Sequence, residues 1–378
     1  MPRHGLAKAG SALDVFGLNA ALLQLIRQKI DNDGPQPFAW FMEQALYHPE
    51  HGYYSSDRAA IGRRGDYFTN VSVGPLFGQL LAMQFAEIWE RLGKIDKFTI
   101  VEQGAHHGEF ACDVLEFLKR RSPQMFSAVR YRIVEPFSKL QDRQSQTLRE
   151  FRDCVDWRKS LDELEPFDGV HFSNELLDSM PINLRNKLVG LNENRFVFVD
   201  SPTEQITNQS QLDWIRNVAM KLKRGFVLAV DYGFPNEEFR ESLQIRAQHR
   251  SLGSPFEEIG NADITAHVNW TNVAATAEKY GLRVSGFTDQ HHFLTGIISE
   301  FGRGGSPEPL AKASPDGTDC GQSSLPSDSS SKRALQTLLH PEMLGRSFQV
   351  LALSKGVDPG AALSGFTFGR DPREALGL

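Results

Sequence analysis

A carboxylate and two glycines lie close together in residues 98–110 of this sequence. An apolar run ends at Glu102, Gly104 and Gly108 follow within six residues, and a helical pattern begins directly afterwards. This order predicts a buried parallel strand, a tight turn and a helix N-terminus. In a doubly wound sheet, that junction is the usual binding place of a nucleotide-like ligand.

A second carboxylate, Glu135, ends the next apolar segment, residues 131–134. An Asp or Glu about 20 to 30 residues past the glycines has the spacing of a group that binds a ribose diol. Glu102 adds a different signal, because a carboxylate repels a pyrophosphate and attracts a sulfonium or an ammonium. The two acids together favour S-adenosylmethionine as the cofactor. Glu102 disfavours a nicotinamide, whose usual Gly-x-Gly-x-x-Gly is also absent from this turn.

Adjacent histidines occur twice, at His106-His107 and at His291-His292. We expect neither pair to bind a metal. Neighbouring side chains on a turn or strand point apart, and no third ligand follows at a supporting interval.

The composition excludes several classes of function. The chain has 378 residues, a net charge of −6 and a hydrophobic share of 40%. These values are typical of an enzyme and not of a nucleic-acid-binding protein with a basic face. The 3 cysteines indicate neither a disulfide framework nor a zinc knuckle. No apolar run approaches the roughly 18 residues that would span a membrane. The expected compartment is the cytoplasm, with the mitochondrial matrix as the alternative.

The elements that must position the two acids follow from hydrophobic periodicity. Residues 18–30 and 76–92 repeat at helical spacing. Short apolar runs predict strands at residues 98–101, 131–134, 154–157, 169–173 and 226–230, and two late strands at 282–287 and 348–353. Helical segments lie between most of these strands. The alternation predicts an α/β fold with a doubly wound, Rossmann-like sheet.

The remaining segments suggest how the chain is divided. Residues 1–95 are expected to form an N-terminal helical cap, and residues 96–302 together with 334–378 the core. Insertions at about 182–200, interpreted as a hairpin, and at about 234–272 are expected to form a lid over a substrate. Gly, Pro and Ser supply 16 of the 31 residues in 303–333. That share predicts a flexible insertion.

A series of motifs runs in a fixed order through residues 38–366. The motifs are Tyr53-Tyr54, Ile61-Gly62, Gly65-Asp66-Tyr67-Phe68-Thr69, Leu76-Phe77-Gly78, the turn from Glu102 to Gly108, Val134-Glu135-Pro136, Asn174-Glu175-Leu176-Leu177-Asp178-Ser179-Met180-Pro181, Asp231-Tyr232-Gly233, Asp263-Ile264-Thr265-Ala266-His267-Val268-Asn269-Trp270 and Phe293-Leu294-Thr295-Gly296. This series resembles the MidA-like family of S-adenosylmethionine-dependent methyltransferases, which includes a mitochondrial complex I assembly factor that methylates a protein arginine. The resemblance implies a class I methyltransferase core and a protein substrate, with a respiratory complex subunit as one candidate.

The sequence departs from the family pattern at two positions. The family's turn usually reads Glu-x-Gly-x-Gly-x-Gly, whereas His106 replaces the middle glycine here. Glycine at that position permits positive φ and close approach of a ligand, and histidine does both less easily. Ser72 stands where the family usually has a glutamate.

Glu175, Asp178 and Asn174 are the candidate catalytic residues, since they follow the fourth predicted strand at the edge of the pocket. An arginine stays protonated and donates through a planar fork, so its methylation needs carboxylates that orient it. Two acids three residues apart on a strand-to-helix turn can do this. The same residues would also suit a helix N-terminus, and Asn174 could orient an amine or an amide instead.

Beside Glu102, Gly104, Gly108 and Glu135, the resemblance implies a place near the cofactor for Asp66, Thr69 and Trp157. Asp66 and Thr69 would cover the site, and Asp66 would meet the methionine ammonium or the substrate. Trp157 would lie beside the adenine, although an ordinary core position suits it equally. Asp263, Thr265 and His267 would line a substrate groove, with a structural hydrogen bond as the alternative for His267.

The sequence therefore predicts an S-adenosylmethionine-dependent methyltransferase that acts on a protein arginine side chain. Two alternatives stay open. One is methylation of a small molecule, and the other is a binding or assembly factor that keeps the fold without turnover. We expect no nucleic acid, membrane or metal as a partner.

Overall fold

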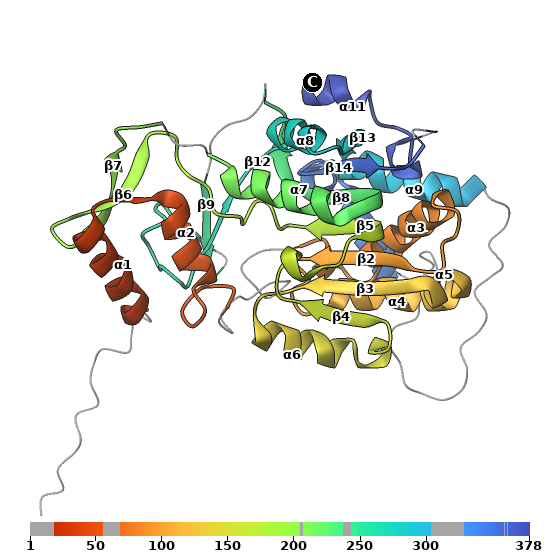
Figure 1. Cartoon of the computed structure of the whole chain (residues 1–378), viewed down its shortest axis with the longest axis horizontal. Helices are drawn as coiled ribbons and strands as arrows, with labels where there is room; N and C mark the ends of the chain where they lie inside the picture. Colours follow the sequence, from red (N-terminus) through yellow and green to blue (C-terminus); the bar gives the residue numbers. More distant parts are fainter. Residues whose placement is uncertain are drawn as a thin grey trace, which may run out of the picture.

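The computed structural model of this chain describes residues 19–55, 69–204, 207–236, 243–248, 250–303, 329–358, 360 and 362–378. Two bodies are visible in it, a large sheet with helices on both faces and a smaller lobe beside it (Figure 1). Among the described residues, no helix is both long and apolar enough to cross a membrane.

The central sheet has seven strands in one continuous path. In spatial order they are β13 (Arg283–Asp289), β14 (Phe348–Lys355), β8 (Leu222–Phe234), β5 (Phe167–Asn174), β2 (Phe98–Gln103), β3 (Val129–Val134) and β4 (Val155–Arg158), and β12 (Val268–Asn269) also pairs with β8. The five strands from β8 to β4 are parallel, and β14 is antiparallel to both of its neighbours. Strand order reverses between β2 and β5. The crevice at that switch point is where doubly wound sheets bind their ligands.

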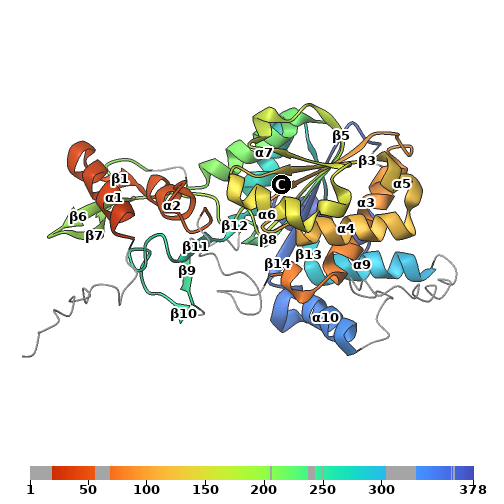
Figure 2. The ribbon, with the colours of Figure 1, turned by 90° about the horizontal axis from the view of Figure 1, so that it is seen from below.

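Alternate side chains of the strands enter two separate hydrophobic clusters. In β8, Leu228 and Val230 join the cluster on one face of the sheet, and Val227 and Ala229 join the cluster on the other. The helices of the first face are α3 (Leu76–Arg91), α4 (Glu109–Arg121), α9 (Gln290–Arg303) and α10 (Ser329–Leu339) (Figure 2). Those of the second face are α7 (Gln209–Lys221) and α8 (Trp270–Lys279) (Figure 1). The expected doubly wound α/β fold is confirmed. Further helices are α5 (Pro123–Ala128), α6 (Ser138–Thr147) and α11 (Pro372–Leu376).

A third hydrophobic cluster holds the smaller body together, which we call the N-terminal lobe. It combines α1 (Ala20–Asp33), α2 (Phe38–Tyr47), β1 (Gln36–Pro37), the hairpin β6 (Lys187–Asn192) and β7 (Arg195–Asp200), and the sheet of β9 (Leu243–Ala247), β10 (Arg250–Ser251) and β11 (Asp263–Ala266). Three segments far apart in the sequence therefore share one core, as seen at the left of Figure 1. Both expected insertions contribute to this lobe.

The structure corrects three of the expected boundaries. Helix α3 packs on the sheet with Leu80, Phe85 and Ile88, so the N-terminal region does not form a cap as far as residue 95. The hairpin begins at Lys187 and not at residue 182. Its two strands are joined by Glu193 and Asn194 at φ 48° and 65°, the left-handed pair that a two-residue hairpin loop requires.

The third correction concerns residues 303–333, which we expect to be flexible. Helix α10 begins at Ser329, so the end of that segment is helical. Residues 304–328 lie outside the described part of the chain.

Candidate active site

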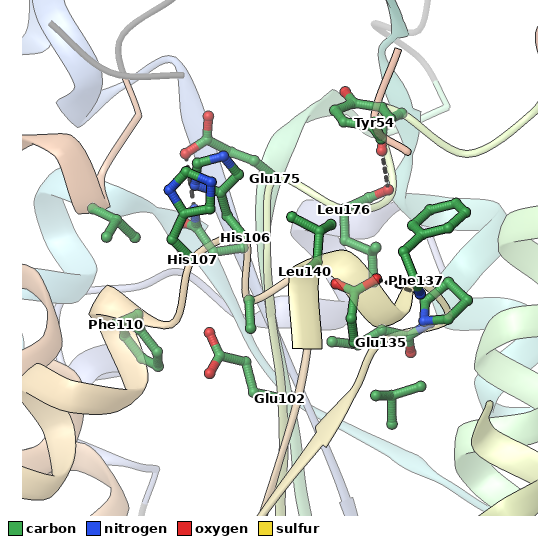
Figure 3. Close-up of a pocket in the computed structure, with 18 of the residues that line it drawn as sticks. Tyr54, Glu102, His106, His107, Phe110, Glu135, Phe137, Leu140, Glu175 and Leu176 are labelled. Carbon is green, nitrogen blue, oxygen red and sulfur yellow. Dashed lines mark hydrogen bonds between the residues drawn. The ribbon is translucent and has the colours of Figure 1, made fainter. Parts of the chain in front are cut away.

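A cavity of about 570 Å³ opens at the carboxyl ends of β2, β3 and β5 (Figure 3). Its wall includes the turn after β2, the segment after β3 and the segment after β5, and the N-terminal lobe adds Glu43, Tyr47 and Tyr54. The volume lies in the range of sites that enclose a small molecule or a cofactor. The cavity thus occupies the switch point of the sheet and is closed on one side by the lobe.

Glu102, at the end of β2, is buried and lines the cavity. Its Oε2 accepts a hydrogen bond from the Tyr131 hydroxyl at 2.7 Å. Burial raises the pKa of the Glu102 carboxyl to about 8, and the bond from Tyr131 opposes that shift. A carboxyl that is costly to ionise in the free protein would be stabilised as an anion by a cationic ligand.

The turn after β2 needs left-handed backbone at three positions. Gly104 and Gly108 both have φ 86°, and His106 has φ 46°. The position that departs from the family's glycines therefore does adopt the conformation that glycine favours, at a cost of about 1–2 kcal/mol for another residue. Gly104 and His106 line the cavity, whereas Gly108 faces helix α6, where an added Cβ would lie 3.5 Å from the Gln144 Cα.

Glu135, directly after β3, is buried and also lines the cavity. Its Oε1 accepts a hydrogen bond from the Phe137 N–H at 3.0 Å. Burial raises the pKa of this carboxyl to about 7, and hydrogen bonds to the charged form hold it lower than burial alone would. Figure 3 shows Glu102 and Glu135 on neighbouring strands, with Phe137 and Leu140 beside Glu135. These placements agree with the spacing that the sequence suggests for a ribose-binding acid.

Asn174 and Glu175 line the cavity at the end of β5. The Asn174 Nδ2 donates to Glu175 Oε1 at 2.8 Å, and the Asn70 N–H donates to the same oxygen at 3.1 Å. Glu175 has φ 52°, a strained backbone that persists only where its surroundings fix it. Burial raises the pKa of Glu175 to about 8.

Asp178 does not lie beside Glu175 in the cavity wall, which corrects the expected pair of carboxylates. It is buried behind the wall next to Asp231. Asp231 Oδ2 accepts from the N–H groups of Leu176, Leu177 and Asp178 at 3.0, 2.7 and 3.3 Å. Burial raises the pKa of Asp231 to about 7, and these donors oppose that shift, whereas burial and the neighbouring acids raise the pKa of Asp178 well above its usual value. Asp178 therefore holds the proton of the pair.

The expected substrate-groove residues Asp263, Thr265 and His267 do not line the cavity either. Asp263 is buried on β11, and its Oδ1 accepts from the Tyr54 hydroxyl at 2.6 Å. Because Tyr54 does line the cavity, Asp263 acts on the wall through that tyrosine. His267 Nε2 forms a hydrogen bond with Gln244 Nε2 at 3.3 Å, the structural role that the sequence left open, and its ring packs edge-on against Phe234 with centroids 5.0 Å apart.

The three residues that the resemblance places near the cofactor, Thr69, Trp157 and Asp66, differ from one another in where they lie. Thr69 lines the cavity, and its Oγ1 accepts from the Ser72 N–H at 3.1 Å. Trp157 lies on β4 outside the cavity wall, which agrees with the alternative that it is a core residue. Asp66 lies outside the described part of the chain.

The histidines on the turn do not point apart as expected. The rings of His106 and His107 stack with centroids 3.7 Å apart and an interplanar angle of 26°. Together with Glu109 they bring three potential metal-ligand atoms within 4.8 Å. Stacked rings direct their lone pairs side by side and not toward one ion, and His107 Nε2 already contacts Arg143 Nη1 at 3.1 Å. This arrangement does not suit the convergent geometry of a metal site.

Several residues of the cavity wall, and Asp231 behind it, were not expected from the sequence. Tyr54 belongs to the Tyr53-Tyr54 motif and Asp231 to Asp231-Tyr232-Gly233, so both were visible as motifs without an assigned role. Glu43 and Tyr47, from α2, carried no local signal. Their position depends on how the lobe packs against the sheet.

Comparison with known proteins identifies relatives of this architecture. A family model of S-adenosyl-L-methionine-dependent methyltransferases matches residues 80–205 and 193–288. A protein from Burkholderia thailandensis, whose crystal structure contains S-adenosyl-homocysteine, superposes with a TM-score of 0.78 at 27% identity, covering 93% of this chain and 96% of that protein.

Two sequence relatives have named activities. The chain is 26% identical to the mitochondrial protein arginine methyltransferase NDUFAF7 homolog of Drosophila melanogaster, over 90% of this chain and 86% of that protein. It is 28% identical to the mouse protein arginine methyltransferase NDUFAF7, over 43% of this chain and 42% of that protein. Both relatives are described as mitochondrial, which agrees with the alternative compartment that the sequence left open and does not support the cytoplasm.

Proposed function

The chain belongs to the family of S-adenosyl-L-methionine-dependent methyltransferases, and from that premise we propose that it methylates an arginine side chain of a protein substrate. The fold is the class I methyltransferase fold, and S-adenosylmethionine is the cofactor. The observation that supports an arginine substrate is Glu175. It is a strained, cavity-facing carboxylate with no ion pair among the described residues.

The cavity wall offers groups that match the polar parts of the cofactor. Glu102 has the charge to hold a cationic group, and Glu135 can accept hydrogen bonds from two hydroxyls of a ribose. Gly104 and His106 shape the turn between them, and Thr69 covers the cavity from the other side. When bound, S-adenosylmethionine supplies the methyl group on its sulfonium.

Glu175 would receive the guanidinium of the substrate. A fork of N–H donors pairs well with a carboxylate, and Asn174 holds Oε1 of that carboxylate in place. Because the pKa of Glu175 is about 8 in the free protein, an arriving guanidinium displaces its proton near neutral pH. Glu175 then orients one guanidinium nitrogen toward the methyl group and accepts the N–H proton that this nitrogen loses when it is methylated. Positioning of this kind contributes strongly to the acceleration of such a transfer.

The N-terminal lobe supplies the rest of the substrate wall. Tyr47 donates its hydroxyl to the Ser179 carbonyl at 3.0 Å, and Tyr54 is held by Asp263. Glu43 adds a second carboxyl, whose pKa is raised by partial burial. An acidic wall with aromatic faces suits a planar cation. A protein substrate, with a respiratory complex subunit as one candidate, is part of this proposal.

The test uses the purified chain, tritiated S-adenosylmethionine and protein extracted from its source cells. Acid hydrolysis and amino-acid analysis should place the label in methylarginine. Glu175→Gln should abolish labelling while S-adenosylhomocysteine still binds in a calorimetric titration. Asp178→Asn should retain labelling, because Asp178 is already neutral and lies outside the cavity wall.

Two outcomes would contradict the proposal. Label in lysine, in histidine or in carboxyl methyl esters would remove arginine as the target. Transfer only to metabolites of low mass would favour the alternative of a small-molecule methyltransferase.

A further inference from the structure

Helix α6 buries one of its ten side chains, and that side chain is a glutamine. Gln144 is fully buried, although its amide would be costly to bury without partners. A hydrocarbon would pack at this position without that cost. The choice of an amide therefore indicates a role for its hydrogen bonds.

The amide of Gln144 joins three separate segments of the sheet edge. Its Nε2 donates to the His106 carbonyl at 2.8 Å and to Glu135 Oε2 at 3.2 Å. Its Oε1 accepts from the Trp157 Nε1–H at 2.9 Å. The turn after β2, the acid after β3 and strand β4 thus meet at one side chain, which comes close to the turn because Gly108 has no side chain to separate them.

We propose that Gln144 is a positioning residue that fixes the Glu135 carboxylate against the His106 turn and so sets the ribose end of the cofactor site. The inference rests on the proposed role of Glu135. Gln144 itself does not line the cavity and acts through the groups that do. Trp157, which we expected beside the adenine, instead orients the Gln144 amide. Because an indole N–H can only donate a hydrogen bond, the amide atom that faces it must be the oxygen, and the amide nitrogen then faces His106 and Glu135.

The amide also influences the charge of Glu135. A donor that points at a carboxylate stabilises its ionised form, and the Gln144 N–H lowers the pKa of Glu135 against the effect of burial. Other titratable groups on the same part of the wall are Glu102, His106, His107 and Arg143. The Glu135 carboxylate accepts from the Phe137 N–H at 3.0 Å and from Gln144 Nε2 at 3.2 Å.

The test replaces Gln144 by methionine, which keeps the length of the side chain and removes its hydrogen bonds. Binding of S-adenosylhomocysteine is measured by calorimetry between pH 6 and 9. Wild-type affinity should rise with pH through about 7, as Glu135 ionises and becomes able to accept from the ribose hydroxyls. Gln144→Met should bind about 10-fold more weakly at pH 7, and its affinity should recover in part toward pH 9, because the pKa of Glu135 is higher without the donor.

A matched control is available on the same helix. The Gln141 Nε2 donates to the backbone carbonyl of Glu135 at 2.7 Å and not to its carboxylate. Gln141→Met should therefore keep the wild-type pH profile. Glu135→Gln should lose the rise in affinity through about pH 7 and keep only the rise near pH 8 that Glu102 contributes.

A second measurement separates this inference from the cofactor assignment. The carboxyl carbon of Glu135, followed by NMR in the free protein, should titrate at higher pH in Gln144→Met than in wild type. An unchanged Glu135 titration would overturn the role of Gln144, as would weaker binding by the same factor at every pH. A shifted Glu135 titration combined with no binding by wild type would support Gln144 as the partner of Glu135 and refute Glu135 as a cofactor ligand.

Discussion

His171 offers a test of the burial and charge described above that does not depend on the active site. It lies on β5, is fully buried, and packs edge-on against Trp214 with ring centroids 5.5 Å apart. Neither ring nitrogen has a hydrogen-bond partner among the described residues. An unsatisfied buried polar group costs about 1–3 kcal/mol, and a swap to a hydrocarbon of similar volume usually costs less than about 1.5 kcal/mol. His171→Leu should therefore stabilise the protein by about 1–2 kcal/mol at pH 7.

Acidification should enlarge that difference. Burial lowers the pKa of His171 to about 3, whereas a histidine in the unfolded chain has its ordinary pKa of about 6.5. Between these values the unfolded protein carries a proton that the folded protein lacks, so wild type loses stability as the pH falls below 6.5. From pH 6.5 to pH 5 that loss is about 2 kcal/mol, at about 1.36 kcal/mol for each pH unit. His171→Leu avoids the loss, and its advantage over wild type should grow by that amount.

Urea unfolding followed by tryptophan fluorescence at pH 7 and pH 5 measures both effects. His171→Asn separates them, because an asparagine keeps a polar group in the core but does not titrate. It should be less stable than His171→Leu at both pH values, yet gain the same amount relative to wild type on acidification. The reasoning would be refuted if His171→Leu were less stable than wild type at pH 7 and the difference did not change at pH 5.

Three further predictions concern the active site. Turnover of an arginine substrate under kcat/KM conditions should rise with pH up to about 8 and then level off, because Glu175 must lose its proton to pair with a guanidinium; a flat profile in a stopped assay with tritiated cofactor would contradict this role. Asp231→Asn should lower kcat at least 10-fold while the affinity for S-adenosylhomocysteine stays within about 2-fold, since it removes the carboxylate that holds three N–H groups after Glu175. Equal losses in kcat and in this affinity would indicate general unfolding instead. His106→Gly should tighten binding of S-adenosylhomocysteine and change the free energy of unfolding by less than about 1 kcal/mol, because relief of the left-handed backbone offsets the added entropy of the unfolded chain; weaker calorimetric binding would show that the imidazole contacts the cofactor.

Local patterns were sufficient to predict the central sheet. Glu102 and Glu135 each follow an apolar run, and parallel neighbours bring the ends of such runs to one edge. These features depend on contacts between residues close in sequence or on adjacent strands. The left-handed φ of His106 was not predicted, although glycine, the residue that the family usually has there, is the one that adopts this conformation most easily.

The substrate side of the cavity depends on packing between distant segments, and local patterns do not contain that information. Glu43 reaches the wall because α2 shares a core with β6, β9 and β11, which begin more than a hundred residues later. The spacing of Glu175 and Asp178 suggested two carboxylates on one turn. Asp231, from the next core strand, accepts the intervening N–H groups and turns the chain so that Asp178 points away from the cavity.

Asp178 and Gln144 both show that local sequence does not determine the role of a buried polar residue. An acid in a motif appears functional from the sequence, yet its role depends on whether it remains ionised when it is buried. Of Asp178 and Asp231, the second accepts from four N–H donors, which favour its ionised form. Gln144, on a polar helix, appears from the sequence to be a surface residue. Its amide is nevertheless buried and forms hydrogen bonds with His106, Glu135 and Trp157. In both cases the deciding quantity is the number of donors and acceptors that converge on one atom. That number depends on the fold, so the hydrogen bonds around a buried polar group identify its function more directly than the motif that contains it.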